Sequence, residues 1–216
     1  AASQDGTGTG IRPFLYDHSG NRMILGGAGG QFIIVRLDGE EWRTEPIADG
    51  VIESQSARAG VAIDGDRAVV TYVGLSKIKV LAFDGTRWQL ESEWSLPDLN
   101  WAQTAVLSAD LQGGRLVIGD PMKTVGATSH VGRALVYAQV GNAWTLEATL
   151  SHSEEEADLQ FGHSVSVDGD LVAVGAWGDD VGSRVNAGSA SVFRKVGGQW
   201  TRIHTLTPDA TVANDG

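Results

Sequence analysis

Tryptophan recurs at near-regular intervals along this chain of 216 residues. Four of its seven tryptophans stand in similar contexts, DGEEW, DGTRW, VGNAW and VGGQW, at Trp42, Trp88, Trp144 and Trp200. The intervals between them are 46, 56 and 56 residues. A period of this size is typical of proteins in which each repeat is one supersecondary unit. The chain is therefore expected to consist of four copies of one structural unit.

Each copy contains short apolar runs that are separated by turn residues. In the last copy, the runs GHSVSVD, DLVAVGA and SASVFRK precede the tryptophan, and a further run begins with it. The runs are rich in Val, Ile and aromatic residues and are bounded by Gly, Asp and Asn, which favours strands over helices. Each copy is therefore predicted to be a four-stranded antiparallel sheet.

Sheets of this size cannot bury both faces alone, and radial packing of several such sheets solves the problem in a β-propeller. The predicted fold class is all-β, a β-propeller of four-stranded antiparallel blades in a single domain over residues 1–216. A β-sandwich is the alternative, but it does not explain the regular repeat. The predicted blades cover about residues 11–50, 51–98, 99–151 and 158–210.

Composition excludes several classes of function. The chain has no cysteine, which excludes a disulfide framework and a thiol nucleophile. Its net charge is −11, with 16 basic residues among 27 acidic ones, and this balance argues against nucleic-acid binding. No apolar run is long enough to insert into a membrane as a helix. Nucleophile elbows, phosphate loops and zinc signatures are absent from the sequence, so we expect no enzyme activity.

The fourth copy contains Phe161-Gly162 and, further on, Gly175-Ala176-Trp177. This pattern resembles the FG-GAP repeat, which is named for Phe-Gly and Gly-Ala-Pro, with Trp177 in place of the proline. The resemblance implies a propeller like that of integrin α-chains, a role in ligand binding or adhesion, and a secreted or cell-surface location. Such propellers usually have seven blades, so four copies imply a four-bladed ring, a part of a larger propeller, or a ring completed by other copies.

In integrin-type repeats, a long acidic loop between the first and second strands binds calcium. Calcium requires six to eight oxygen ligands. In this chain the corresponding loop is shortened to Asp64-Gly65-Asp66 in the second copy and Asp168-Gly169-Asp170 in the fourth. A short Asp-Gly connection is a strong signal for a β-hairpin turn. We therefore expect hairpins here and no cofactor, with calcium possible but not favoured.

Candidate binding residues lie outside the repeated tryptophan position. Trp94, Trp101 and Trp177 could stack on a sugar or anchor a protein partner, although packing between blades is the alternative. Trp177 precedes an insert, residues 178–186, which also holds Asp179, Asp180 and Asn186. These three residues could contribute to a site, or they could belong to a solvated loop. Binding residues concentrate on such loops in rigid scaffolds.

The sequence therefore predicts a non-catalytic extracellular interaction or adhesion module that presents propeller loops to a protein partner or to its own copies. The alternative is a lectin-like propeller that binds a glycan through its loop tryptophans. Nucleic acid is not an expected partner.

Overall fold

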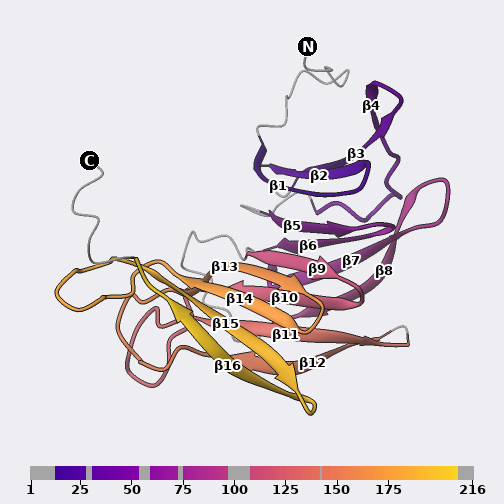
Figure 1. Cartoon of the computed structure of the whole chain (residues 1–216). Helices are drawn as coiled ribbons and strands as arrows, with labels where there is room; N and C mark the ends of the chain where they lie inside the picture. The colour runs from indigo at the N-terminus through magenta and orange to yellow at the C-terminus, as the bar shows by residue number, and fades with distance from the viewer. Residues whose placement is uncertain are drawn as a thin grey trace. The chain divides into compact units, whose positions relative to one another are not determined.

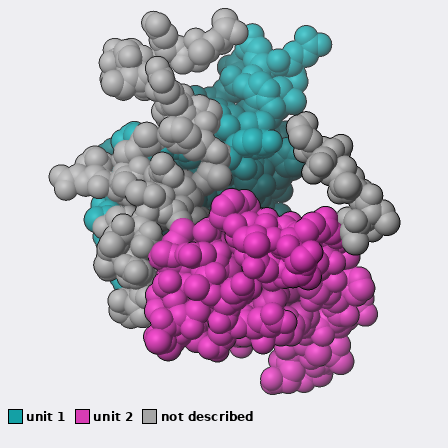
Figure 2. Space-filling view, turned by 90° about the vertical axis from the view of Figure 1, so that its left-hand side faces the viewer, with its two compact units in different colours: residues 1–95 teal, residues 96–216 magenta. Residues whose placement is uncertain are grey.

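The computed structural model of the chain describes residues 13–27, 31–53, 59–72, 75–96, 108–141 and 143–208 (Figure 1). The chain divides into two compact units, residues 1–95 and 96–216, which Figure 2 colours separately. The described residues form four antiparallel sheets of four strands each, two sheets per unit. The predicted all-β propeller class is confirmed, while the prediction of a single domain over residues 1–216 stays a prediction.

The strands of each sheet follow one another in chain order. In the first unit, blade 1 consists of β1 (Pro13–Ser19), β2 (Arg22–Gly27), β3 (Phe32–Asp38) and β4 (Glu41–Thr44). Blade 2 consists of β5 (Ala59–Asp64), β6 (Arg67–Tyr72), β7 (Lys77–Phe83) and β8 (Trp88–Ser95).

The second unit repeats this arrangement. Blade 3 consists of β9 (Ala109–Gln112), β10 (Arg115–Asp120), β11 (Arg133–Val140) and β12 (Ala143–Leu150). Blade 4 consists of β13 (Phe161–Asp168), β14 (Leu171–Ala176), β15 (Ser189–Val196) and β16 (Gln199–Leu206). Each sheet lies inside one of the ranges predicted from the repeat. No membrane-spanning helix is found within the described residues.

The first two strands of every blade are joined by a two-residue turn that begins with glycine. These glycines have φ between 55° and 59°, and they are Gly20, Gly65, Gly113 and Gly169. A positive φ at the first turn position is what a tight hairpin requires, and glycine adopts it without steric strain. Asp64 pairs with Arg67, and Asp168 pairs with Leu171, across these turns. The hairpin prediction for both Asp-Gly-Asp segments is therefore confirmed.

Each unit buries its own apolar core between its two blades. In the first unit the core is built mainly from β-branched and aromatic side chains, among them Ile24, Phe32, Val61, Tyr72 and Trp88. In the second unit it includes Val136, Leu159, Phe161, Val174 and Phe193. The buried side chains of the central strands explain why their sequences read as nearly continuous apolar runs.

Candidate functional site

An aspartate on the first strand of one blade binds the backbone of the next blade. In the first unit, Asp17 Oδ2 accepts a hydrogen bond of 2.7 Å from the N–H of Ile63. In the second unit, Asp110 Oδ2 accepts one of 2.7 Å from the N–H of Val167. Since β5 and β13 are edge strands of their sheets, these N–H groups would otherwise have no partner at a partly buried junction. The same device thus joins blade 1 to blade 2 and blade 3 to blade 4.

An arginine at the start of the second strand reinforces each junction. Arg22 Nε lies 2.9 Å from Glu45 of its own blade, and Arg22 Nη1 lies 2.5 Å from Asp66 of the next blade. In the second unit, Arg115 lies 3.5 Å from Glu147 and 3.3 Å from Asp170. The last aspartate of each Asp-Gly-Asp turn is therefore part of a junction between blades.

The recurrent tryptophan completes the junction from the side of the next blade. Trp88 Nε1 donates to Glu45 at 2.8 Å, and Trp200 Nε1 donates to Glu147 at 3.1 Å. We call the resulting set the inter-blade clamp: Asp17, Arg22, Glu45, Asp66 and Trp88 in the first unit, and Asp110, Arg115, Glu147, Asp170 and Trp200 in the second. Trp42 is not part of either clamp, and its side chain is 51% exposed.

The Phe-Gly pair lies where the first strand of blade 4 meets blade 3. The N–H of Phe161 donates to the carbonyl of Val131 at 2.9 Å, and Ser108 Oγ donates to the carbonyl of Gly162 at 2.9 Å. A Cβ atom on Gly162 would lie 2.3 Å from the carbonyl oxygen of Arg133. Glycine is therefore required here, because the two backbones approach too closely for any side chain.

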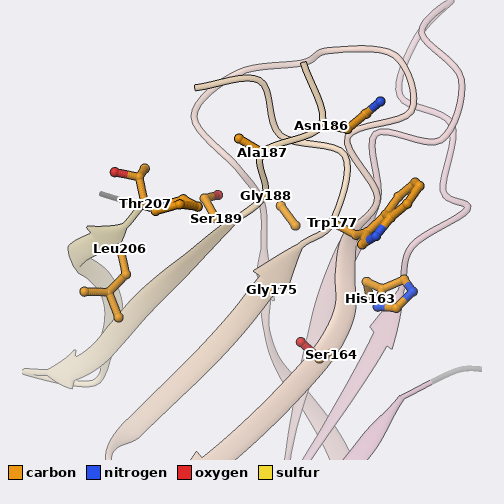
Figure 3. A pocket seen from close by; sticks show the side chains of 12 residues that line it. His163, Ser164, Gly175, Trp177, Asn186, Ala187, Gly188, Ser189, Leu206 and Thr207 are labelled. Atoms are coloured by element: carbon orange, nitrogen blue, oxygen red, sulfur yellow. The ribbon is translucent and has the colours of Figure 1, made fainter. Parts of the chain in front are cut away.

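Blade 4 carries a surface pocket with a cavity volume of about 510 Å³. Figure 3 shows Trp177 and His163 on one side of it and Leu206 and Thr207 on the other. Trp177 is 57% exposed, and its ring stacks with that of His163 at a centroid distance of 6.4 Å. The pocket is lined by His163, Ser164, Gly175, Ala176, Trp177, Asn186, Ala187, Gly188, Ser189, Leu206, Thr207 and Pro208.

The insert beside the pocket is shaped by its own hydrogen bonds. Val181 and Arg184 exchange backbone bonds of 3.0 and 3.2 Å and form a miniature hairpin. The N–H of Asn186 donates to Asp180 Oδ1 at 2.7 Å, and the carbonyl of Asp179 accepts from Gly188 at 2.9 Å. Asn186 thus lines the pocket, whereas Asp179 and Asp180 hold the loop that forms its wall.

Glu156 lies on the segment between β12 and β13, which connects blade 3 to blade 4. Burial raises the pKa of the Glu156 carboxyl, and the charges of Asp180 and Asp179 raise it further. The buried carboxylate of Asp179 also faces His152 Nε2 at 3.6 Å. Within the described residues, no group of three or more His, Asp or Glu side chains could hold a metal ion. The expectation that no calcium is bound stays a prediction.

The other two candidate tryptophans are not part of this pocket. Trp94 lies on β8 of the first unit and is half-buried, and Trp101 lies outside the described residues. Sequence reasoning missed His163, Ser164 and Ser189, which line the pocket. The signal available for Ser164 was its position in the repeat, since Ser108 stands 56 residues earlier, one full period.

Comparison with known families identifies the repeat. Residues 144–193 match the FG-GAP repeat. The chain carries an FG-GAP repeat. The matched segment runs from β12 of blade 3 into β15 of blade 4, so it contains the Phe-Gly pair and most of the residues that line the pocket. The resemblance seen in the sequence is thereby confirmed.

Solved structures with a similar fold share little sequence with this chain. A protein from Lactobacillus plantarum is 12% identical, with a TM-score of 0.59, and the match covers 94% of this chain and 57% of that protein. The computationally designed Ika4 protein is 12% identical, with a TM-score of 0.52, and the match covers 89% of this chain and 95% of Ika4. At this identity the likeness concerns the fold alone. No curated protein sequence matches the chain.

The FG-GAP repeat indicates a propeller that serves as a protein-interaction module. Propellers of this kind are generally non-catalytic.

Proposed function

We propose that the chain is a secreted or cell-surface adhesion module that binds a protein partner, or its own copies, at the pocket of blade 4. The observation that carries this proposal is the exposed Trp177 at the rim of that pocket. Its ring stacks with that of His163, and the apolar side chain of Leu206 lies on the opposite side of the pocket. Tryptophan is enriched among the residues that contribute most to protein interfaces, particularly beside pockets.

The chemistry of the pocket supports binding rather than catalysis. Its lining includes one histidine and the hydroxyl groups of Ser164, Ser189 and Thr207. The lining residues in the described part of the chain include no carboxylate that would orient His163 as a general base. The groups present can donate and accept hydrogen bonds around an apolar centre, which suits recognition of a ligand.

Affinity capture from an extracellular fraction tests the proposal. Trp177→Ala should abolish capture of the partner, because it removes the largest exposed apolar side chain of the pocket. Trp42→Ala is the matched control, since Trp42 is also about half exposed but lies in the first unit. Equal capture by the wild type and the Trp177 variant would show that the partner does not bind at this pocket.

A glycan is the second candidate ligand, and the stacked ring pair favours it. A sugar face packs well on an exposed indole, while Asn186 and Ser164 could bind its hydroxyl groups. A glycan array with the wild type and Trp177→Ala distinguishes the two functions. A glycan signal that disappears in the variant would favour the lectin-like alternative. If the wild type binds no glycan on the array, the protein partner is the favoured ligand.

A further inference from the structure

The pocket of blade 4 has a counterpart in blade 3. In blade 4 a Cβ atom on Gly175 would lie 2.4 Å from Ser164 Oγ, and in blade 3 a Cβ atom on Gly119 would lie 2.3 Å from Ser108 Oγ. The loops between the second and third strands of the two blades end alike, since His130 and Asn186 both have φ of 52° and both stand two residues before a glycine with positive φ. The two blades thus present the same backbone surface at the same place.

In blade 3 this surface binds the beginning of β13. Three hydrogen bonds join them, all of 2.9 Å: Gln160 N–H to the carbonyl of His130, Phe161 N–H to that of Val131, and Ser108 Oγ to that of Gly162. Phe161 also forms a parallel bridge with Gly132. The Phe-Gly segment is therefore held by its backbone, with the phenyl ring buried in the core.

In blade 4 the equivalent groups line the pocket. They are the carbonyls of Asn186 and Ala187 and the hydroxyl of Ser164, each 56 residues after its counterpart in blade 3. Among the described residues, no hydrogen bond to these two carbonyls is found. The hydroxyl of Ser189, on the same wall, is buried and likewise has no hydrogen-bond partner in the described structure. The pocket therefore offers hydrogen-bonding groups that suit an extended strand.

Only a segment with two particular features can bind to the pocket as β13 binds to blade 3. It needs a backbone N–H at the position of Phe161 and a glycine at the position of Gly162. The first strand of blade 1 has Pro13 at the position of Phe161, since Pro13 pairs with Gly27 of β2 and Phe161 pairs with Ala176 of β14. Proline has no N–H, so this strand cannot donate the required hydrogen bond. In a second copy of the chain, Phe161 and Gly162 are already bound within blade 3.

Blade 4 also differs from blade 3 beside the pocket, at the positions that the clamp residues occupy in blade 3. Leu171 and Ile203 stand at the positions of Arg115 and Glu147 in the clamp, and they are 36% and 45% exposed. Ser166 stands at the position of Asp110. A segment that binds here therefore meets apolar side chains in place of the charged clamp. The side chains of the segment that face them are expected to be apolar too.

We propose that the pocket of blade 4 is a docking site for the first strand of a further FG-GAP blade, which enters with its apolar-Gly dipeptide. This inference rests on the proposed function, because it specifies the protein partner of the same pocket. The partner's backbone would bond to Asn186, Ala187 and Ser164, as β13 bonds to blade 3.

A synthetic peptide tests the proposal directly. The fluorescently labelled peptide ADLQFGHSVSVDG, which copies residues 157–169, should bind the full chain with a saturable rise in anisotropy. The same peptide with Gly162→Val should not bind, because its side chain would meet backbone. In the protein, Gly175→Ala should weaken peptide binding at least about ten-fold, since its Cβ atom would collide with the docked carbonyl, as that of Gly119 would with Gly162.

A matched pair of variants shows whether the pocket is already filled in the chain itself. Gly119→Ala should lower the melting temperature markedly, because its Cβ atom would lie 1.9 Å from the carbonyl oxygen of Gly162. Gly175→Ala should change the melting temperature little, because its Cβ atom would meet only the movable hydroxyl of Ser164 closely. Equal destabilisation by both variants would overturn the proposal.

Other outcomes separate this inference from the proposed function. Absence of peptide binding, with partner capture still lost in Trp177→Ala, would overturn the docking of a Phe-Gly strand and leave the proposed function standing. Peptide binding that Gly175→Ala does not weaken would also overturn the inference. A doubled molar mass that Gly175→Ala abolishes would identify a second copy as the occupant, against the proposal.

Discussion

At the scale of single residues, Gly162 shows what a sequence signature means physically. Its Cβ-free backbone lies against Arg133 and Gly119 of the preceding blade, where a side chain has no space. The Phe-Gly pair could be recognised in the sequence from its resemblance to a family. Its contact with Gly119 could not be predicted, because nothing local in the sequence indicates which backbone lies opposite a glycine.

Tyr72 provides a prediction for pH dependence. Its side chain is fully buried in the core of the first unit, and burial raises its pKa to about 12. Between pH 10 and pH 12 the unfolded chain loses this proton while the folded chain keeps it, so the stability contributed by Tyr72 is present below pH 10 and is lost as the pH rises towards 12. Ultraviolet titration should therefore show one tyrosine ionising late.

The variant Tyr72→Phe identifies that tyrosine. It should remove the late step from the titration. If all tyrosines of the wild type ionise together near pH 10 while the protein stays folded, then Tyr72 is accessible to solvent and is not buried in the core.

At the scale of elements, the aspartate of the clamp determines how blades adhere within a unit. Asp110→Ala should lower the free energy of unfolding by about 1–3 kcal/mol, because it leaves the N–H of Val167 without a partner at the junction. Asp17→Ala should have a similar effect through Ile63. Denaturant unfolding measures both, and Asp38→Ala, at the exposed end of β3, is the control expected to change stability little.

A loss as small as that of the control would mean that the aspartates do not join the blades. Asp17 and Asp110 occupy the same repeat position in two different units, so the two substitutions should have similar effects on stability. Ala62 and Ser166 occupy that position in blades 2 and 4, so the clamp is not built into every copy of the repeat.

The strands could be predicted from sequence, whereas the clamp could not. Short runs of Val and Ile, bounded by Gly and Asp, are local signals, and the tryptophan period groups them into blades. Arg22 and Glu45 are joined to Asp66 by folding across two blades, and no local pattern predicts such a contact. Trp42 shows that similar local sequences can have different surroundings, because its sequence context resembles that of Trp88 while Trp42 is exposed and Trp88 is buried.

At the scale of the whole molecule, the sequence predicted more of the fold than of the site. Four sheets follow from a repeat that can be counted. The pocket of blade 4 depends on how β13, β14 and the insert converge, so only Trp177 and Asn186 among the predicted residues line it. The remaining lining is backbone and small side chains, including Gly175 and Ala187, which carry no chemical signal in a sequence.

Removal of calcium should change neither the molar mass nor the melting temperature of the chain. Asp66 and Asp170, the turn residues closest to the family's calcium loop, already pair with arginines, and Asp64 and Asp168 close hairpins of two residues. Light scattering on a sizing column, with and without a chelator, should therefore give the same molar mass, and the melting temperature should not change. A lower mass or a lower melting temperature after chelation would show a structural cation. The Asp-Gly-Asp turns would then have to supply oxygen ligands, which their pairing with Arg22 and Arg115 opposes.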